Sequence, residues 1–285
     1  MAELKDRVAR YLSHPGRPAG VRFWRRKQRS YLTLSLIIAQ SDPVAAAALV
    51  QLQDRIKANL GYPCVVDNPE AQDADCLFRY PTESLHCSLV NFLTSRQDFD
   101  VFSTKSGVRE HLTHLIVKHV ERAGLGPAQA LIGGLYPGST SAPIDSFSLQ
   151  LFPEDEFVEA IGRIAASASN DRLFRNAVSL LPDCCSRVTV KGYPPAGGGN
   201  IERFPVNILR FMHKAGSGEC VNTGQEHIKD EVLEFNRSYQ VGGRIPIRLS
   251  IDRLALVEPD PFLFGWKSLR EFNLRIRPGG GDAAD

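Results

Sequence analysis

The chain has 285 residues, of which 43% are hydrophobic and 23% are charged. This balance is typical of a folded protein with a sizeable core and excludes a largely disordered chain. The formal net charge of +2 is too small to indicate nucleic-acid binding by itself, because such binding depends on a local patch of Lys and Arg.

The six cysteines show neither a CxxC pair nor a repeated spacing. The sequence therefore predicts free thiols rather than a zinc site or a disulfide framework. No stretch approaches the roughly 20 apolar residues that span a bilayer, and the N-terminus lacks the apolar core of a signal peptide. We therefore expect a cytoplasmic protein that does not enter a membrane.

Residues 1–30 form a segment of their own, rich in basic side chains. The stretch RPAGVRFWRRKQR surrounds Phe23 and Trp24 with arginines and a lysine, without a sustained apolar period. Arginines can contact phosphates and aromatic rings can stack on bases, so one interpretation is a basic arm that contacts RNA. The alternative is a solvated N-terminal helix and linker, packed by its aromatic residues.

A strand and a helix are predicted directly after this arm. In YLTLSLIIAQ, which begins at Tyr31, apolar residues alternate along one face, as in a strand. Asp42 then suits a helix N-cap and Pro43 a first turn. Apolar residues recur at helical spacing up to Gly61, which can end the helix.

The nine residues LHCSLVNFL, at 85–93, alternate as a strand does and place His86 and Ser88 on one side. Residues two apart in a strand lie about 6.5–7 Å apart and project from the same face, so the two side chains converge on one ligand. Histidine has an unperturbed pKa of about 6.5 and exchanges protons near neutral pH, and a hydroxyl can donate to a phosphate oxygen. The pair therefore suits phosphoester chemistry. The alternative is a structural histidine on a half-buried strand, with its hydrogen bonds made within the protein.

Helices and strands continue to alternate through the rest of the chain. The predicted elements are helices at 106–124, 153–167 and 227–239 and strands at 144–152, 202–212, 245–258 and 266–276. No glycine-rich phosphate loop follows a strand. The order therefore favours an α+β fold over a nucleotide-binding doubly wound sheet.

From residue 31 to residue 277 this order resembles the 2H phosphoesterase family, which is named after two His-x-Thr/Ser motifs. The match is carried, in chain order, by YLTLSLIIAQ, LHCSLVNFL, LEFNRSY, RLSIDRLALVE and WKSLREFNL. The resemblance implies an α+β fold of two pseudo-symmetric lobes, with antiparallel sheets lining a central cleft and helices outside. We therefore expect a basic arm at 1–30, a 2H-like domain at 31–277 and a flexible tail at 278–285.

The second motif of the family resembles P-H-x-T-L-x-R, and FPVNILRF stands in its place. The alignment puts Pro205 at the second histidine, Asn207 at the Thr or Ser, and Arg210 at a frequent arginine. In the family one histidine activates water or a ribose hydroxyl and the other protonates the leaving oxygen. Proline can do neither, and a positioned acid or base contributes about 10²–10⁴-fold. The resemblance therefore implies ligand binding with impaired or altered turnover.

Other histidines are weaker substitutes for the missing one. His213 lies six residues beyond Asn207, about 20 Å along a strand. His111, in HLTH, spells the motif but lies in a predicted helix, where residues two apart point to nearly opposite sides. With His114 it forms a helical pair without further metal ligands, so a helix-surface pair is favoured over a metal site.

Further candidate ligand contacts flank the two motifs. Arg248, in RLSI with Ser250, offers a fixed positive charge for phosphate. RLSI is also an alternative second motif if the alignment is displaced by one strand. Tyr80 and Arg79 precede the first motif, and ordinary solvent exposure of a loop is the alternative for both.

The leading hypothesis is a phosphodiesterase, free of metal and cofactor, that acts on a cyclic phosphate or a 2′-5′ linkage in a nucleotide or RNA. His86 is then the acid or base and Ser88 holds the phosphate. Asn207, Arg210 and Arg248 contact the substrate. The alternatives are a nucleotide- or RNA-binding module without turnover, and a structural or partner-binding protein whose cleft no longer holds phosphate.

Overall fold

The computed structural model of the chain describes residues 32–60, 65–66, 76–136, 146–183, 188–192, 201, 203–212, 244–259 and 266–275. The predicted basic arm, the predicted tail, the predicted helix at 227–239 and His213 lie outside these residues. Within them the chain has the predicted α+β fold, with eleven strands in one sheet.

The strands are numbered in chain order. They are β1 (Leu32–Ile37), β2 (Val65–Val66), β3 (Cys76–Arg79), β4 (His86–Leu93), β5 (Ala128–Tyr136), β6 (Ser146–Pro153), β7 (Thr189–Val190), β8 (Phe204–Met212), β9 (Arg244–Ile251), β10 (Arg253–Pro259) and β11 (Trp266–Asn273). Of these, β1, β4, β6, β8 and β11 correspond to predicted strands.

The helices connect these strands. They are α3 (Ile38–Ser41), α4 (Pro43–Leu60), the 3₁₀ turn η1 (Thr82–Ser84), α5 (Arg96–Thr104), α6 (Ser106–Arg122), α7 (Asp155–Asn170) and α8 (Arg172–Ser179). The predictions of α4, α6 and α7 are confirmed, whereas α5 and α8 were not predicted. In the described residues we find no helix with both the length and the apolar character needed to cross a membrane.

Sequence signals for helix ends are also visible in the structure. Asp42 Oδ1 accepts the backbone N–H groups of Val44 and Ala45 at 3.1 and 2.9 Å, so Asp42 caps α4 as predicted. Gly124 follows α6 with a φ of 65°. This left-handed conformation favours glycine and ends the helix there.

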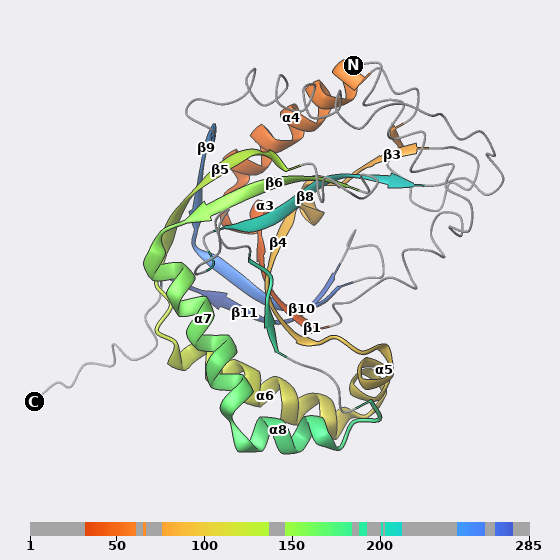
Figure 1. Ribbon diagram of the computed structural model, residues 1–285, viewed down its shortest axis with the longest axis vertical. Helices are drawn as coiled ribbons and strands as arrows, with labels where there is room; N and C mark the ends of the chain where they lie inside the picture. Colours follow the sequence, from red (N-terminus) through yellow and green to blue (C-terminus); the bar gives the residue numbers. More distant parts are fainter. Residues whose placement is uncertain are drawn as a thin grey trace, which may run out of the picture.

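The sheet has the strand order β11-β10-β1-β4-β8-β6-β5-β9, and each pair in this path is antiparallel. β3 pairs with β2 and β8, and β7 pairs with β4. Figure 1 shows that the sheet curls, with α4 on one side of the curl and α6, α7 and α8 outside the other. The expected separate sheets are thus joined into one, because β4 pairs with β8. The expected two lobes and central cleft are not established by this sheet.

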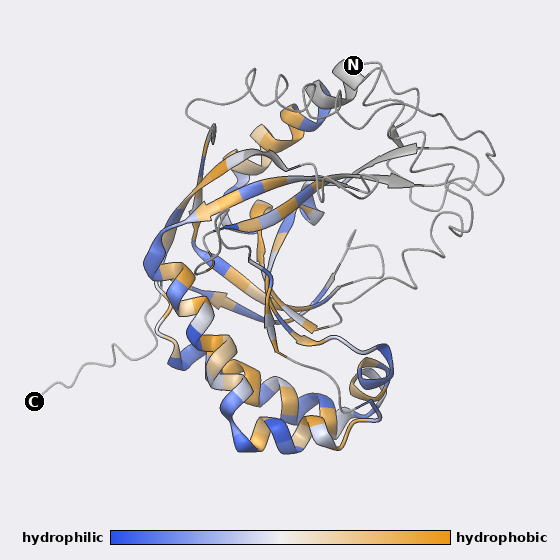
Figure 2. Cartoon of the chain, viewed as in Figure 1, coloured by the Kyte–Doolittle hydropathy of each residue, from blue (hydrophilic) through white to orange (hydrophobic). Residues whose placement is uncertain are grey.

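The outer face of the sheet is apolar and packs against the helices. Leu34 of β1, Val206 of β8 and Leu149 of β6 are fully buried in one core with Leu49 of α4 and Ile116 of α6. Burying such a side chain is worth about 1.5–3 kcal/mol. In Figure 2 apolar residues mark the central strands, and the helices alternate between apolar and polar residues as they turn.

The other face is turned away from the helices, and we call it the concave face. Strand alternation and register assign to it Thr33, Ser35 and Ile37 of β1, His86, Ser88 and Asn91 of β4, Ser148 and Gln150 of β6, and Pro205 and Asn207 of β8. Most of these side chains are polar. The concave face is therefore the part of the sheet to inspect for a binding site.

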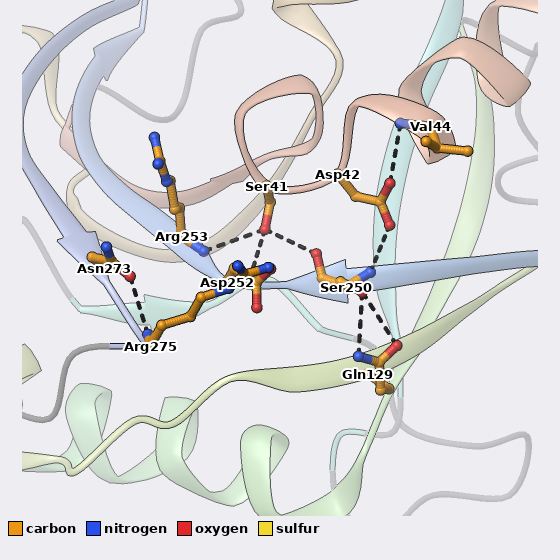
Figure 3. Close-up of polar contacts among 9 residues, drawn as sticks. All are labelled: Ser41, Asp42, Val44, Gln129, Ser250, Asp252, Arg253, Asn273 and Arg275. Atoms are coloured by element: carbon orange, nitrogen blue, oxygen red, sulfur yellow. Dashed lines mark hydrogen bonds and ion pairs between the residues drawn. The ribbon is translucent and has the colours of Figure 1, made fainter.

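The prediction of one strand at 245–258 is wrong, because the chain bends at Asp252 and forms β9 and β10 instead. Ser41 Oγ accepts the N–H of Asp252 at 2.7 Å and that of Arg253 at 3.2 Å, and it donates to the carbonyl of Ser250 at 2.9 Å (Figure 3). The hydroxyl thus satisfies backbone groups at the bend. As a result β9 pairs with β5, whereas β10 pairs with β1 and β11.

Candidate functional site on the concave face

Strands β4 and β8 bring the first motif beside the segment that stands in place of the second. Cys87 pairs antiparallel with Val206, and both side chains lie in the apolar core. Their neighbours therefore pair on the concave face, with His86 beside Asn207. Cβ atoms in such pairs lie about 4.5–5.5 Å apart, so one small ligand can contact both side chains.

Ser88 and Pro205 form the next pair in the same register. Pro205 also pairs with Gln150 of β6, and Ser88 pairs with Ser35 of β1. Ser88, Pro205 and Gln150 are half-buried. Ser88 and Gln150 thus flank the position at which the family resemblance places the second histidine.

His86 is 5% exposed, and a backbone group orients its ring. Its Nδ1 lies 2.8 Å from the carbonyl oxygen of Ser84. Because a carbonyl oxygen only accepts, Nδ1 donates its hydrogen there, and Nε2 of the neutral ring keeps a lone pair. In this tautomer Nε2 is the basic nitrogen of the ring.

Tyr80 supports this histidine from the core side. It is fully buried, and its ring stands edge-on to that of His86, with centroids 6.4 Å apart. The alternative of ordinary solvent exposure is therefore wrong for Tyr80. A buried side chain in this place holds the imidazole, and contact between Tyr80 and a ligand stays a prediction.

Asn207 is fixed by a neighbouring hydroxyl. Ser148 Oγ donates to Asn207 Oδ1 at 2.5 Å across β6 and β8. With the oxygen engaged, the Nδ2 hydrogens are what Asn207 offers to a ligand. A neutral amide can donate a hydrogen bond to a phosphate oxygen, but it does not release a proton at neutral pH.

Buried polar groups continue the concave face along β1 and β4. Thr33 Oγ1 donates to Asn91 Oδ1 at 3.2 Å, and both residues are buried. Among the described residues, Ser35 Oγ and Asn91 Nδ2 have no hydrogen-bond partner. Leaving such groups unpaired costs about 1–3 kcal/mol each. The concave face along β1 and β4 is therefore polar, even though unpaired polar groups there lower the stability of the fold.

Two predicted arginines are not brought next to His86 in the described structure. Arg248 is exposed on β9. The strands β5 and β6 separate β9 from β8, a spacing of about 14 Å across the sheet. Arg210 pairs with Ser146 in the β6–β8 register, and its side chain lies outside the described part, as does that of Arg79. Phosphate contact by Arg210 or Arg248 stays a prediction.

RLSI is not a substitute motif strand next to β4. Ser250 belongs to β9, where its N–H donates to Asp42 Oδ2 at 2.9 Å (Figure 3). Its hydroxyl lies within hydrogen-bond distance of the side chain of Gln129. These contacts join the start of α4 to β9 and β5, so Ser250 has a structural role.

His111 and His114 of α6 lie on the helix surface, as the sequence predicts. His111 and His114 are both exposed. Across the described ranges, no three His, Cys, Asp or Glu residues form a group that could hold a metal ion. Cys87 is a free thiol, as predicted, and burial raises its pKa well above the usual range. It is therefore a packing residue rather than a nucleophile.

Ser148 and Gln150 were not predicted as site residues. They occupy the polar phase of the predicted strand at 144–152, which the sequence does indicate. Alternation identifies that phase, but it does not tell which strand lies alongside. Only the pairing of β6 with β8 brings Ser148 to Asn207.

Two surface hollows lie away from the concave face. One, of about 240 Å³, is lined by the end of α6 and by β11. The other, of about 650 Å³, lies along α6 and includes Arg109, His114 and Arg270. Neither includes a residue of the concave face.

Comparisons with known proteins give little guidance. No protein-family model and no curated protein matches the chain. Among solved structures, it is similar to the crystal structure of TT0787 of Thermus thermophilus, with 15% identity and a TM-score of 0.43, over 86% of this chain and 98% of that chain. A likeness of this degree carries no argument about activity.

Proposed function

We propose that the chain is a 2H-phosphoesterase-like protein whose concave face binds a phosphodiester of a nucleotide or RNA, with His86 as its acid–base group. The observation that carries the proposal is the pairing of Cys87 with Val206, because an antiparallel register then puts His86 beside Asn207. The motif-like residue types of both strands then face one small area. The ligand class is a 2′,3′-cyclic phosphate or a 2′-5′ linkage.

His86 supplies the proton transfer in this proposal. Its Nδ1 is held by Ser84, so Nε2 takes a proton from water or from a ribose hydroxyl as that oxygen attacks phosphorus. The hydroxyl of Ser88 and the amide of Asn207 donate to the phosphate oxygens, where negative charge develops. No step requires a metal ion or a cofactor.

Departure of the leaving oxygen is the weak step. That oxygen needs a proton, and Asn207 can only donate a hydrogen bond. Of the described side chains that β1, β4, β6 and β8 turn to the concave face, His86 is the one imidazole, and none is a carboxylic acid. The proton then comes from solvent, so we expect turnover to be slower by about 10²–10⁴-fold than with a second positioned acid.

The test is product release from a panel of nucleoside 2′,3′-cyclic phosphates and 2′-5′ linked dinucleotides. We expect slow hydrolysis by the wild type and a further loss of about 10²-fold or more in His86→Ala. His111→Ala, on the exposed surface of α6, is the matched control and retains wild-type activity. Equal product release by wild type and His86→Ala would exclude the catalytic proposal.

A binding module without turnover is the second candidate. It is favoured by Pro205 and by the Ser148–Asn207 hydrogen bond, because both make the second half of the site a fixed, neutral surface. Calorimetry separates the two candidates. Binding of a cyclic nucleotide that weakens in Asn207→Ala, without any product over hours, would favour the module.

A further inference from the structure

Ser35 of β1 lies on the concave face directly beside Ser88 of β4. Its neighbours in the chain, Leu34 and Leu36, lie in the main apolar core. Its partner in β10, Ala255, instead belongs to a small cluster apart from that core. Paired residues project from the same face of a sheet, so Ser35 points away from the main core and shares the concave face with its partner in β4, Ser88.

The hydroxyl of Ser35 is buried without a hydrogen bond. Ser35 is 1% exposed, and within the part of the chain that the structure describes its Oγ has no partner. Burying an unpaired hydroxyl lowers the stability of a fold, whereas a small apolar side chain in the same place does not. An unpaired hydroxyl beside a proposed binding residue therefore indicates a partner that is available only in the ligand-bound state.

Asn91 of β4 presents a second unpaired group on the same face. Thr33 Oγ1 donates to Asn91 Oδ1 and so fixes the amide, but Nδ2 has no partner among the described side chains and backbone groups. Thr33 pairs with Asn91 and lies two residues before Ser35, so Asn91 is a diagonal neighbour of Ser35. Diagonal neighbours in a sheet are within reach of a long side chain. Nδ2 can therefore donate to Ser35 Oγ after a change of side-chain rotamer.

We infer that Ser35 is a positioning residue, which donates to Ser88 Oγ when Ser88 binds a phosphate oxygen. The inference rests on the proposed function, in which the Ser88 hydroxyl donates to the ligand. Cβ atoms of directly paired residues lie about 4.5–5.5 Å apart, so two serine hydroxyls can meet at hydrogen-bond distance. Ser35 itself does not touch the phosphate, because it is almost completely buried.

A chain of three donors then leads to the ligand. Asn91 Nδ2 donates to Ser35 Oγ, Ser35 donates to Ser88 Oγ, and Ser88 donates to the phosphate, so each serine oxygen accepts one hydrogen bond and donates one. A serine hydroxyl alone can turn its hydrogen toward any acceptor. With Ser35 as its donor, the hydrogen of Ser88 is directed to the phosphate, and the bonds of the chain strengthen one another.

Two measurements on Ser35→Ala test the inference. One is the affinity for a nucleoside 2′,3′-cyclic phosphate, measured by calorimetry, and the other is the melting temperature of the protein without ligand. We expect the affinity to fall about three- to tenfold, because Ser88 loses its donor. We expect the melting temperature to rise by about 2 °C, because an unpaired buried hydroxyl is removed. A merely structural hydroxyl would give a lower melting temperature instead.

Thr113→Val is the matched control. Thr113 Oγ1 of α6 is another buried hydroxyl without a hydrogen-bond partner in the described ranges, and Thr113 lines the hollow along α6 rather than the concave face. Its removal raises the melting temperature in the same way and leaves the affinity unchanged. Ser88→Ala gives the second comparison. Added to Ser88→Ala, the Ser35→Ala change has no further effect on affinity, since Ser35 acts through Ser88.

An unchanged affinity in Ser35→Ala would overturn the inference and leave the proposed function standing. An unchanged or lower melting temperature would overturn it too, because Ser35 would then have a partner in the protein without ligand, such as an ordered water. A further loss of affinity when Ser35→Ala is added to Ser88→Ala would likewise overturn it, since Ser35 would then act without Ser88. A wild type that binds no cyclic phosphate removes the proposed function itself, and the inference with it.

Discussion

At the residue scale, Pro205 distinguishes this site from one with two titratable groups. It lies in β8 between Ser88 of β4 and Gln150 of β6. Its ring offers no proton, and both neighbours are neutral donors. The chemistry that we propose therefore depends on His86 alone, with Asn207 as a fixed hydrogen-bond donor.

Restoring the missing imidazole tests this description. Pro205→His places a second histidine between Ser88 and Gln150, where it can protonate a leaving oxygen. We expect the rate of cyclic-phosphate hydrolysis to rise by about 10²-fold or more over wild type. Pro205→Gln, of similar size but unable to transfer protons, is the control. An equal effect of the two substitutions would show that the imidazole itself contributes nothing.

At the scale of elements, His119 of α6 joins three helices. It is 3% exposed, and its Nδ1 lies 2.8 Å from Ser167 Oγ of α7. Its Nε2 lies 2.9 Å from Oδ2 of Asp171, which caps α8 by accepting the N–H of Leu173 at 2.7 Å. A buried imidazole with both nitrogens engaged holds the helix layer in one arrangement.

The pKa of Asp171 makes this junction sensitive to acid. Burial acts to raise the pKa of Asp171, but the N–H groups of Leu173 and Phe174 and the nearby His119 outweigh it and lower the pKa below the ordinary value. A carboxyl whose folded pKa is lowered stabilises the fold fully above its unfolded pKa of about 4, and this contribution disappears as the pH falls through the folded pKa.

Asp171→Asn should therefore reduce stability at neutral pH and not in acid. Asparagine is as good a helix cap as aspartate, so the substitution removes mainly the charge. We expect the free energy of unfolding, measured in urea, to fall by about 0.5–1 kcal/mol at pH 7 and by almost nothing at pH 2. Asp100→Asn, which breaks an exposed Arg96–Asp100 pair, is the control and changes stability little at either pH. If the free energy of unfolding differed between wild type and Asp171→Asn by the same amount at both pH values, this account would be contradicted.

Regular elements could be predicted from the sequence because their signals are local. The cap at Asp42 and the alternation around His86 each depend on neighbouring residues. The bend between β9 and β10 does not, because it is held by Ser41, 211 residues earlier. That is why one strand was predicted where the chain forms two.

At the scale of the whole molecule, the candidate site is a product of strand register. His86 and Ser88 could be selected from the sequence because their residue types suit phosphate chemistry at strand spacing. Ser148 could not, since it reaches Asn207 only through the pairing of two distant segments, β6 and β8. The curled sheet brings these segments together, with the helices on its outer side (Figure 1).

A crystal structure with a nucleoside 2′,3′-cyclic phosphate at saturating concentration tests the central claim most directly. We expect the phosphate on the concave face, with oxygens about 2.7–3.2 Å from His86 Nε2 and Asn207 Nδ2. A ligand bound instead in the hollow between α6 and β11, or bound without any contact to His86, would contradict the claim.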